Sequence, residues 1–265
     1  MRVALVTGAG RGIGAATTLA LARTGWAVLA VDLADDLPEL PYPMTTASDL
    51  ADVVSSANAQ AGQGGTTLAH QADVRSIAEL EAAVALAEDR FGGLDAAIGC
   101  AGVIGGGLPQ WQVPIEIEHT VLDVNLGGML NLARAAVPAL LRRPQPRQGR
   151  FLAVSSAAAT RGMPMLTAYC AAKAGVAGLI RALAVELGGT GVTANAVSPG
   201  STDTPILVES ARLYGLDAAA EFAAQQPIGR LLSPADVAAV LAFLAEAETG
   251  AMTGAVVPVD GGLAL

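Results

Sequence analysis

Cysteine, aromatic residues and charge are all scarce in this chain. The two cysteines, Cys100 and Cys170, supply neither a disulfide framework nor the paired spacing of a metal-ligand motif, so we expect two small buried thiols and no metal site. Only 15% of the residues are charged and 3% are aromatic, whereas 52% are hydrophobic. A chain of this composition can bury a large aliphatic core and is a poor candidate for disorder.

Positive charge is the scarcer sign, and the formal net charge is −9. An acidic surface repels a phosphate backbone, which argues against a nucleic-acid partner. Lys173 is the only lysine among 15 basic residues, which indicates that an ammonium group is required at this position. The first residues lack the features of a signal peptide, and no uninterrupted apolar run reaches about 18 residues, so we expect a cytoplasmic protein without a membrane span.

Short apolar runs alternate along the chain with longer alanine-rich stretches of helical periodicity. The runs that predict strands are 2–7, 27–32, 66–72, 94–99, 150–155, 191–197 and 255–259. The stretches that predict helices are 12–24, 49–60, 76–91, 117–141, 167–187 and 233–244. Uniformly apolar strands separated by helices imply a parallel sheet that is covered on both faces.

We therefore predict an α/β fold, a Rossmann-type doubly wound parallel sheet of about seven strands with helices on both faces. No repeat or linker interrupts the pattern, so residues 1–265 are expected to form one domain. The segments expected to be irregular are 34–48, 103–116 and 201–227. The last of these is the expected substrate-loop region.

A glycine-rich turn at 7–14 joins the first predicted strand to the first predicted helix. Glycine lets backbone N–H groups approach a pyrophosphate, and the helix N-terminus adds about half a positive charge there. Gly8, Gly12 and Gly14 are the expected contacts, with Arg11 and Ile13 between them. Because the pattern lies between a strand and a helix, it favours dinucleotide binding over an ordinary glycine turn.

Asp32 ends the second predicted strand. A carboxylate at this position can accept hydrogen bonds from the ribose hydroxyls of NAD and repels the additional phosphate of NADP. Arg11 would attract that phosphate, but we expect the carboxylate to dominate. The sequence therefore favours NAD, and a solvated strand end is the alternative interpretation of Asp32.

Tyr169 and Lys173 lie four residues apart on one predicted helix. Residues with this spacing share a helix face, so the phenol and the ammonium group can lie close together. A free tyrosine has a pKa of about 10, and a nearby cation lowers the pKa by favouring the phenolate. The pair predicts a general base for alcohol oxidation, which acts as the acid in the reverse direction. The alternative is a chance pair on a solvated helix face.

Together with Asn125 and Ser156, these residues and the glycine turn resemble the single-domain short-chain dehydrogenases/reductases, from residue 3 to residue 262. The resemblance implies that Ser156 hydrogen-bonds the substrate oxygen and stabilises its developing charge. It implies that Lys173 also binds the nicotinamide ribose, and that Asn125 holds a water linking Lys173 to solvent. Taken alone, Ser156 could cap a turn and Asn125 could satisfy helix backbone groups.

The same resemblance implies further cofactor contacts at positions that match the family's adenine, ribose and carboxamide segments. These positions are Asp73, Val74, Ala101, Gly102, Pro199, Gly200, Thr202 and Thr204, in addition to Tyr169 and Lys173. Gly99 and Cys100 stand where the family usually has two asparagines, so side-chain bonds from this segment are in doubt. The residues after Ser156 also lack a glycine that is common there.

The segment 35–50, DDLPELPYPMTTASDL, is longer than the usual link after the second strand. Together with LTAYCAAKAG and NAVSPGSTDTP, it resembles the dehydrogenases associated with mycofactocin. That resemblance implies that residues 34–48 cover a bound NAD, which stays on the enzyme and passes electrons to this peptide-derived redox cofactor. A surface loop of no consequence is the alternative.

The segments flanking the expected substrate site are mostly apolar. Their large apolar residues are Ile104, Leu108, Trp111, Met163, Met165, Leu207 and Tyr214. Arg161 and Arg212 are the nearby cations, and both are expected to be solvated. We therefore predict hydride transfer between NAD and a neutral, apolar secondary alcohol or ketone, terpene-like or alicyclic.

Two other functions fit less of the sequence. An NADPH-dependent carbonyl reductase is disfavoured by Asp32. A non-catalytic NAD-binding regulator is disfavoured because Ser156, Tyr169 and Lys173 are all present. Family resemblance implies a homotetramer built through the two long alanine-rich helices and the last strand, and a dimer is the alternative.

Overall fold

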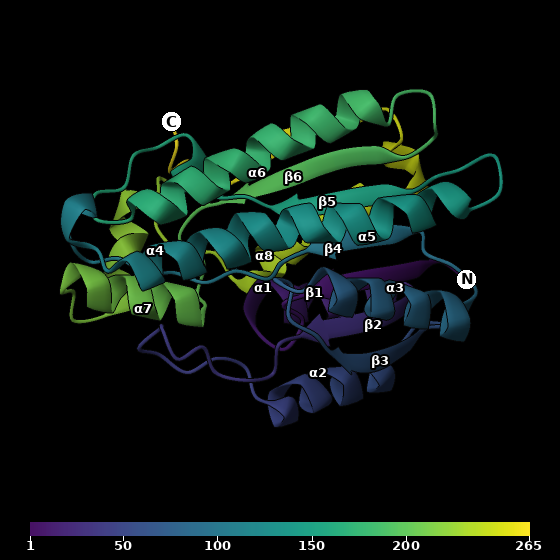
Figure 1. Cartoon of the computed structure of the whole chain (residues 1–265), viewed down its shortest axis with the longest axis horizontal. Coiled ribbons are helices and arrows are strands. Elements are labelled where there is room, and N and C mark those ends of the chain that lie inside the picture. Colours follow the sequence, from purple (N-terminus) through teal and green to yellow (C-terminus); the bar gives the residue numbers. More distant parts are fainter.

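One sheet of seven parallel strands forms the centre of the molecule (Figure 1), in a computed structural model that describes residues 1–265. The strands are β1 Val3–Thr7, β2 Ala27–Asp32, β3 Thr66–Gln71, β4 Ala96–Gly99, β5 Arg150–Val154, β6 Thr193–Pro199 and β7 Val256–Val259. Their order is β3-β2-β1-β4-β5-β6-β7, and every neighbouring pair is parallel. The predicted doubly wound sheet is confirmed.

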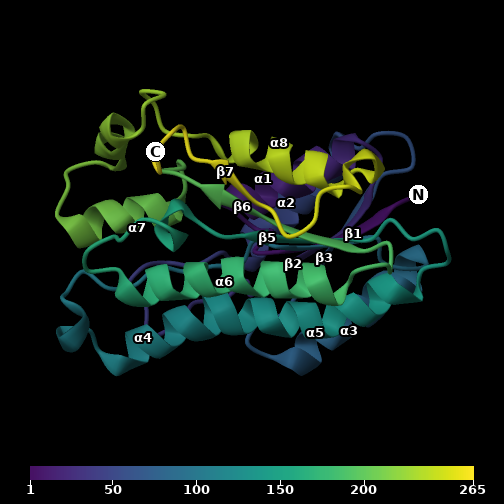
Figure 2. The same cartoon turned by 90° about the horizontal axis from the view of Figure 1, so that it is seen from above.

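Helices cover both faces of the sheet (Figure 2). One face carries α1 Gly12–Arg23, α2 Ala47–Ala59 and α8 Pro234–Ala245, and the other carries α3 Ile77–Phe91, α4 Ile115–Leu122, α5 Gly128–Arg142 and α6 Thr167–Glu186. Helix α7, Pro205–Tyr214, lies beyond one end of the strands. Because both faces are covered, strands β1, β2, β4, β5 and β6 are buried at every position, which explains why most of their residues are apolar.

Short helical turns complete the fold. The 3₁₀ turns are Gln110–Gln112, Ala157–Ala159, Ala219–Gln225 and Ala247–Thr249. A π-helical turn at Asp123–Gly127 joins α4 to α5.

Cys100 and Cys170 are free thiols, and both are partly rather than fully buried, contrary to expectation.

The expectation that 201–227 is irregular was wrong for its first half. Thr204 caps the N-terminus of α7 by accepting a hydrogen bond from Leu207 N, and Pro205 occupies the first turn. Gly215 ends the helix in the left-handed conformation. These are ordinary helix start and stop signals, so the threonine–proline pair and the glycine would have predicted α7.

Two helical stretches, 115–142 and 167–186, are long and apolar enough to span a bilayer by length and composition alone. In the structure both lie along the sheet, and about half of each apolar window is buried inside the molecule, 56% and 44%. Their alanine-rich composition therefore fits close packing of helices on the sheet.

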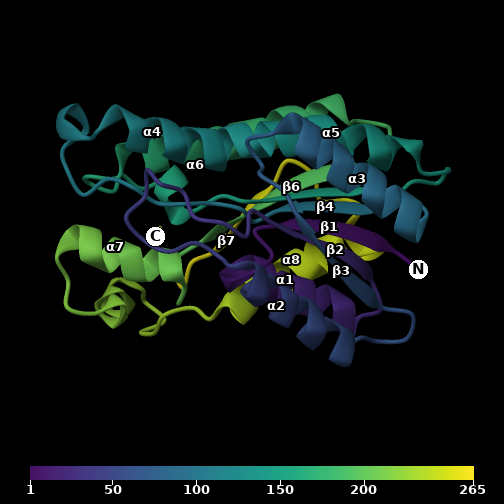
Figure 3. The same ribbon diagram turned by 60° about the horizontal axis from the view of Figure 1, so that its bottom comes forward.

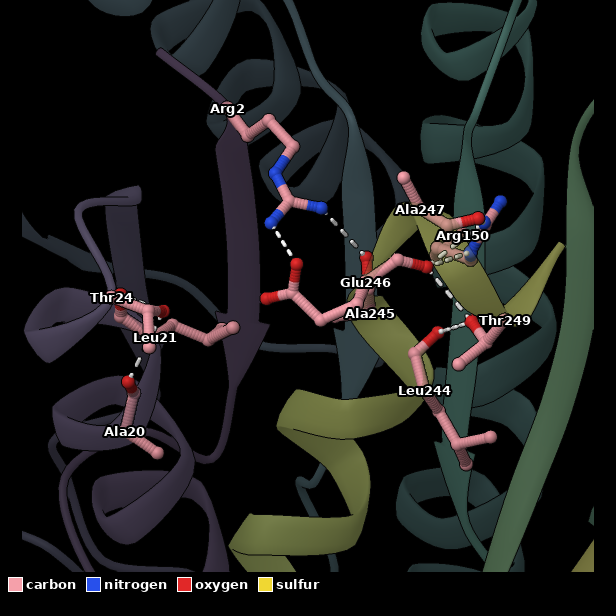
Figure 4. A network of polar contacts seen from close by, with 10 residues as sticks. All are labelled: Arg2, Ala20, Leu21, Thr24, Arg150, Leu244, Ala245, Glu246, Ala247 and Thr249. Atoms are coloured by element: carbon pink, nitrogen blue, oxygen red, sulfur yellow. Dashed lines mark hydrogen bonds and ion pairs between the residues drawn. The ribbon is translucent and has the colours of Figure 1, made fainter.

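A buried guanidinium joins β5 to the end of α8 (Figure 4). Arg150 is 1% exposed and donates to the carbonyl oxygens of Glu246, Ala247 and Gly149. Arg2, the residue just before β1, pairs with the Glu246 carboxylate. Helix carbonyls at a C-terminus lack partners within the helix, so the arginine donors satisfy them and fix α8 against the sheet.

The order of the strands determines where the candidate ligand site lies. The chain leaves β1 for β2 on one side and later inserts β4 on its other side. Connections therefore diverge at the carboxyl ends of β1 and β4, which leaves a crevice where ligands bind in open α/β sheets. The 33–46 segment, which links β2 to α2, crosses this end of the sheet near α7 (Figure 3).

Removal of the α8 cap will destabilise the fold. Ser233 and Asp236 form a reciprocal capping box at the start of α8. We expect Ser233→Ala to lower the free energy of unfolding by about 1 kcal/mol, measured by urea denaturation. Ser56→Ala, at an exposed position inside α2, should leave that free energy unchanged or slightly raised, because alanine is the better helix former. Equal effects of the two substitutions would contradict the assignment of the cap.

Candidate active site

The glycine turn after β1 has a backbone that only glycine readily adopts. Gly8 and Gly12 have φ of +65° and +56°. A Cβ on Gly8 would lie 2.6 Å from Ala101 N, and one on Gly14 would lie 2.0 Å from Gly8 O. The turn is thus packed against the segment after β4 and opens the twelve-residue helix α1 with free N–H groups. Such a turn forms an anion-binding cradle.

Asp32 lies at the end of β2 beside this turn and is 8% exposed. One carboxylate oxygen accepts from Gly10 N at 2.8 Å, and the other accepts from Ala34 N at 3.3 Å. The carboxylate is therefore held in place by backbone donors while it still lines the cavity.

A cavity of about 610 Å³ extends along the carboxyl ends of the strands. The predicted positions that line it are Gly8, Arg11, Gly12, Ile13, Gly14, Asp32, Asp73, Val74, Ala101, Gly102, Ser156, Tyr169, Lys173, Pro199, Gly200, Thr202 and Thr204. Among the predicted catalytic and cofactor-binding residues, Asn125 alone does not line it. Positions spread from Gly8 to Thr204 in the sequence are thus brought to one crevice.

Tyr169 and Lys173 lie one helical turn apart on α6. The Lys173 ammonium is 5.6 Å from the centroid of the Tyr169 ring. Lys173 is 4% exposed, and its Nζ donates to the carbonyl oxygen of Val154 on β5 at 3.0 Å. Burial lowers the pKa of Lys173 from 10.5 to about 8.

The tyrosine is not acidified by the lysine in this structure, contrary to expectation. Burial raises the pKa of Tyr169 above its ordinary value, and the opposing influence is a hydrogen bond with the Ser156 hydroxyl. Lys173 directs its ammonium to Val154 O instead of to the phenol. In the protein without cofactor, burial therefore favours the neutral phenol over the phenolate.

Two adjacent serines after β5 have different partners. Ser156 follows the strand, and its Oγ accepts from Ala158 N at 3.1 Å while it lines the cavity. Ser155 is buried and donates to the backbone carbonyl of Lys173 at 2.9 Å. Ser155 thereby fixes α6 against β5, and Ser156 presents its hydroxyl to Tyr169.

Asn125 lies in the π-helical turn and is 1% exposed. Its amide donates to Val103 O and Val121 O, and its carbonyl oxygen accepts from Val103 N. The side chain therefore fixes the loop after β4. A Cβ on Gly102 would lie 2.8 Å from Asn125 Oδ1 and 3.5 Å from Lys173 Nζ, so glycine is needed there.

The 33–46 segment is anchored at several points. Leu37 and Leu40 are buried in the main core, and the Tyr42 hydroxyl accepts from Ile104 N at 2.9 Å. Arg11, in the glycine turn, donates to Pro43 O at 2.8 Å. Leu33, Leu37, Met44 and Thr45 line the cavity. Sequence reasoning named the segment but none of these contacts.

The substrate side of the cavity differs in part from expectation. Ile104, Met163, Leu207 and Tyr214 line it as expected. The prediction was wrong for Leu108 and Trp111, whose side chains are 43% and 84% exposed and do not line the cavity. It was also wrong for Met165, which does not line the cavity. The apolar lining residues that sequence reasoning missed are Leu166, Ile206, Leu216, Phe222 and Leu263. The apolar character of α7 would have indicated Ile206, but no local signal indicates Leu263.

Polar groups on the substrate side already have partners inside the protein. Tyr214 donates to Pro164 O, Ser210 donates to Ile206 O, and Arg161 donates to Leu263 O. Arg212 is exposed and forms an ion pair with Glu209. The charge of Arg212 is therefore paired, whereas Arg161 is exposed to solvent, as expected, and donates one N–H to a neutral carbonyl.

The crevice fits a dinucleotide. The glycine turn supplies a cradle at one place, Asp32 a ribose acceptor at another, and the Ser156–Tyr169 pair a proton-transferring centre beside them. A doubly wound α/β protein with these three parts belongs to the class of dinucleotide-dependent oxidoreductases.

Comparison with known proteins agrees with this class. A family model described as enoyl-(acyl carrier protein) reductase matches residues 8–264. The short-chain reductase protein NovJ of Streptomyces niveus is 39% identical, over 98% of this chain and 93% of that protein. The chain belongs to the short-chain dehydrogenase/reductase family.

Solved structures of relatives contain both nicotinamide cofactors. Carveol dehydrogenase from Mycobacterium avium in complex with NAD has a TM-score of 0.92 at 30% identity, covering 99% of this chain and 97% of that chain. An actinorhodin polyketide ketoreductase with NADPH has a TM-score of 0.87 at 30% identity, with the same coverages. The family is therefore established for this chain, and the choice between NAD and NADP depends on its own residues.

The buried lysine should cost stability at neutral pH. A pKa lowered from 10.5 to about 8 means that the folded chain binds fewer protons than the unfolded chain between those values. Wild-type stability should therefore rise with pH across that window, and below pH 8 the buried ammonium costs on the order of 3 kcal/mol. We expect Lys173→Met to raise the free energy of unfolding at pH 7 by about 1–2 kcal/mol, after loss of the bond to Val154.

Urea denaturation of both proteins at pH 7 and pH 9.5 measures this effect. The difference in free energy of unfolding between Lys173→Met and wild type should be smaller at pH 9.5 than at pH 7. A gap that stays constant over this range, or a variant that is less stable at pH 7, would contradict the pKa assignment.

Proposed function

We propose that this protein is an NAD-dependent alcohol dehydrogenase/reductase that transfers hydride between NAD and a neutral, apolar cyclic secondary alcohol or its ketone. The observation that carries the proposal is the Ser156–Tyr169 pair, which faces a cavity that has a dinucleotide cradle and an apolar substrate side. The residues that would hold NAD are the predicted lining positions around the glycine turn, Asp32, Asp73 and Pro199.

Tyr169 and Ser156 act on the same substrate oxygen. The bound nicotinamide ring supplies the hydride acceptor or donor. Tyr169 Oη takes the hydroxyl proton during oxidation and returns it to the carbonyl oxygen during reduction, and Ser156 Oγ donates a hydrogen bond to that oxygen. Because burial raises the pKa of Tyr169, the free protein is set for proton donation. The positive charge of an oxidised nicotinamide would lower the phenol pKa for oxidation, and we propose that Asn125 holds a water that links Lys173 to solvent.

Two observations favour NAD over NADP. The Asp32 carboxylate is fixed at the ribose position and repels a second phosphate. Arg11, the side chain that would attract that phosphate, is engaged by Pro43 O and lies near Met44 Sδ. An NADPH-dependent reductase would need a free cation near the ribose and no carboxylate there.

The substrate class follows from the lining. Ile104, Met163, Leu207, Phe222 and Leu263 form apolar walls. Arg212 is paired with Glu209, and Arg161 is exposed to solvent and bound to Leu263 O, so neither is a buried cation held against the apolar walls. The M. avium relative acts on carveol, an alcohol of this kind, at 30% identity.

The 33–46 segment acts as a lid that retains NAD between turnovers, and mycofactocin then reoxidises the bound cofactor. The anchoring of Tyr42 to Ile104 and of Arg11 to Pro43 supports the lid, because both contacts hold the segment along the cavity. Burial raises the pKa of the Tyr42 phenol to about 12, so the hydroxyl that accepts from Ile104 stays neutral at physiological pH.

Assembly as a homotetramer in the cytoplasm remains part of the proposal. Leu130 on α5 and Val185 on α6 are 48% and 81% exposed. Apolar side chains on the outer faces of two neighbouring helices suit helix–helix packing between subunits.

Loss of the phenol should abolish turnover and leave cofactor binding intact. We expect Tyr169→Phe to lower kcat/KM for cyclohexanol by at least about a thousandfold, because general acid–base catalysis supplies 10²–10⁴-fold. The Kd for NAD, measured by calorimetry on protein freed of nucleotide, should change less than threefold. Cys170→Ala, the neighbouring position on α6, serves as control and should keep full turnover. A Tyr169→Phe protein that still turns over would refute the assigned role.

The lid hypothesis predicts nucleotide retention. We expect protein purified without added cofactor to contain close to one NAD per chain, identified as NAD or NADP by mass spectrometry. Arg11→Ala should release the nucleotide about tenfold faster, because the bond to Pro43 O is lost. Arg23→Ala, which removes an exposed arginine at the other end of α1, should have no effect. An empty protein that exchanges NAD freely would contradict the lid, and retained NADP would contradict the role of Asp32.

A further inference from the structure

The residues after β7 form a closed turn, 260–264, which we call the β7 turn. The Asp260 carboxylate accepts from Gly262 N at 2.9 Å and from Ala264 N at 3.0 Å. Gly261 and Gly262 have φ of +60° and +86°, which lets the backbone reverse. The turn is therefore closed by its own aspartate and does not depend on a ligand for its shape.

Contacts with two other segments fix the β7 turn at the active site. Gly261 O accepts from Ile228 N at 3.1 Å, just after the substrate-loop region. Arg161 Nη1 donates to Leu263 O at 2.9 Å. Arg161 itself lies in the loop that begins at the catalytic Ser156, where its N–H donates to Ala157 O at 2.9 Å. The turn thus connects the substrate loops to the catalytic serine.

Leu263 is the side chain that the turn presents to the site. It is 5% exposed and lines the same cavity as Ser156 and Tyr169. The segments that hold it are substrate-side segments, and the hydrogen bonds that fix the turn do not involve the glycine turn or Asp32. Leu263 therefore lies where a substrate, not the adenosine half of a dinucleotide, would meet it.

We propose that the β7 turn is a wall of the substrate site, that Leu263 limits the size of the substituent a ring substrate can carry, and that Arg161 is the positioning residue that sets this wall. The identity of the substrate rests on the proposed function, whereas the wall itself rests on the contacts of Leu263. Arg161 acts through its bond to Leu263 O.

The test compares oxidation of cyclohexanol with that of 4-tert-butylcyclohexanol, with a dye as electron acceptor so that retained NAD does not prevent turnover. We expect Leu263→Ala to raise the ratio of kcat/KM for the bulky over the small alcohol about tenfold, because a few carbons of pocket space are worth 10–200-fold. Leu263→Phe should lower the same ratio. Leu265→Ala is the matched control, because Leu265 is fully exposed and does not line the cavity.

Arg161 is tested by the same ratio. Arg161→Ala should raise the ratio about threefold or more while kcat for cyclohexanol stays within twofold of wild type. Arg161→Lys should restore the wild-type ratio, because an ammonium can also donate to Leu263 O. A merely structural role for Arg161 would lower kcat for both alcohols equally, and that result would overturn its assignment.

Binding separates failure of this inference from failure of the proposed function. Calorimetry on the NAD-loaded proteins measures the Kd of cyclohexanone and of 4-tert-butylcyclohexanone. If no alcohol is oxidised but Leu263→Ala shifts the ratio of the two Kd values toward the bulky ketone, the proposed function fails and the wall stands. If Leu263→Ala and Leu263→Phe leave the ratio unchanged, or if wild type binds neither ketone, the wall is overturned.

Discussion

Burial of the Lys173 ammonium is the constraint on which the active site depends. Its one hydrogen bond is to Val154 O at the end of β5, and the backbone carbonyl of Lys173 accepts from Ser155 on the same strand end. These two bonds fix the register of α6 on β5, and this register sets Tyr169 beside Ser156. Because a buried ammonium without a full set of partners destabilises the fold, its retention as the only lysine indicates a chemical requirement.

The parallel sheet supplies the geometry around that pair. All seven strands end at one edge, so the glycine turn, Asp32, Ser156 and Thr204 converge although they are far apart in the chain. The 33–46 segment and the β7 turn then border this crevice, the first near Arg11 and the second near Arg161. In both cases an arginine donates to a backbone carbonyl and thereby helps to position a loop.

Prediction from sequence succeeded where the signal is local. The alternation of apolar runs and helical stretches gave the strands and helices to within a few residues, because periodicity reflects which side of each element is buried. The glycine turn was also recognisable from neighbouring residues, because the positive φ at Gly8 favours glycine. Helix α7 was missed although Thr204, Pro205 and Gly215 signal it, so that error lay in the interpretation.

Other features were decided only by tertiary structure. Trp111 and Leu263 look alike in sequence, as apolar residues in irregular segments, yet the first is 84% exposed and the second lines the cavity. The bond from the Lys173 ammonium to Val154 O and the bond from Arg11 to Pro43 O likewise join residues that are distant in the chain. The sequence by itself determined the order of elements, the dinucleotide turn and the Tyr169–Lys173 spacing, because each depends on neighbouring residues. Burial and long-range contacts determined the protonation of Tyr169 and the walls of the pocket, because the cost of charge and the shape of a cavity depend on everything packed around them.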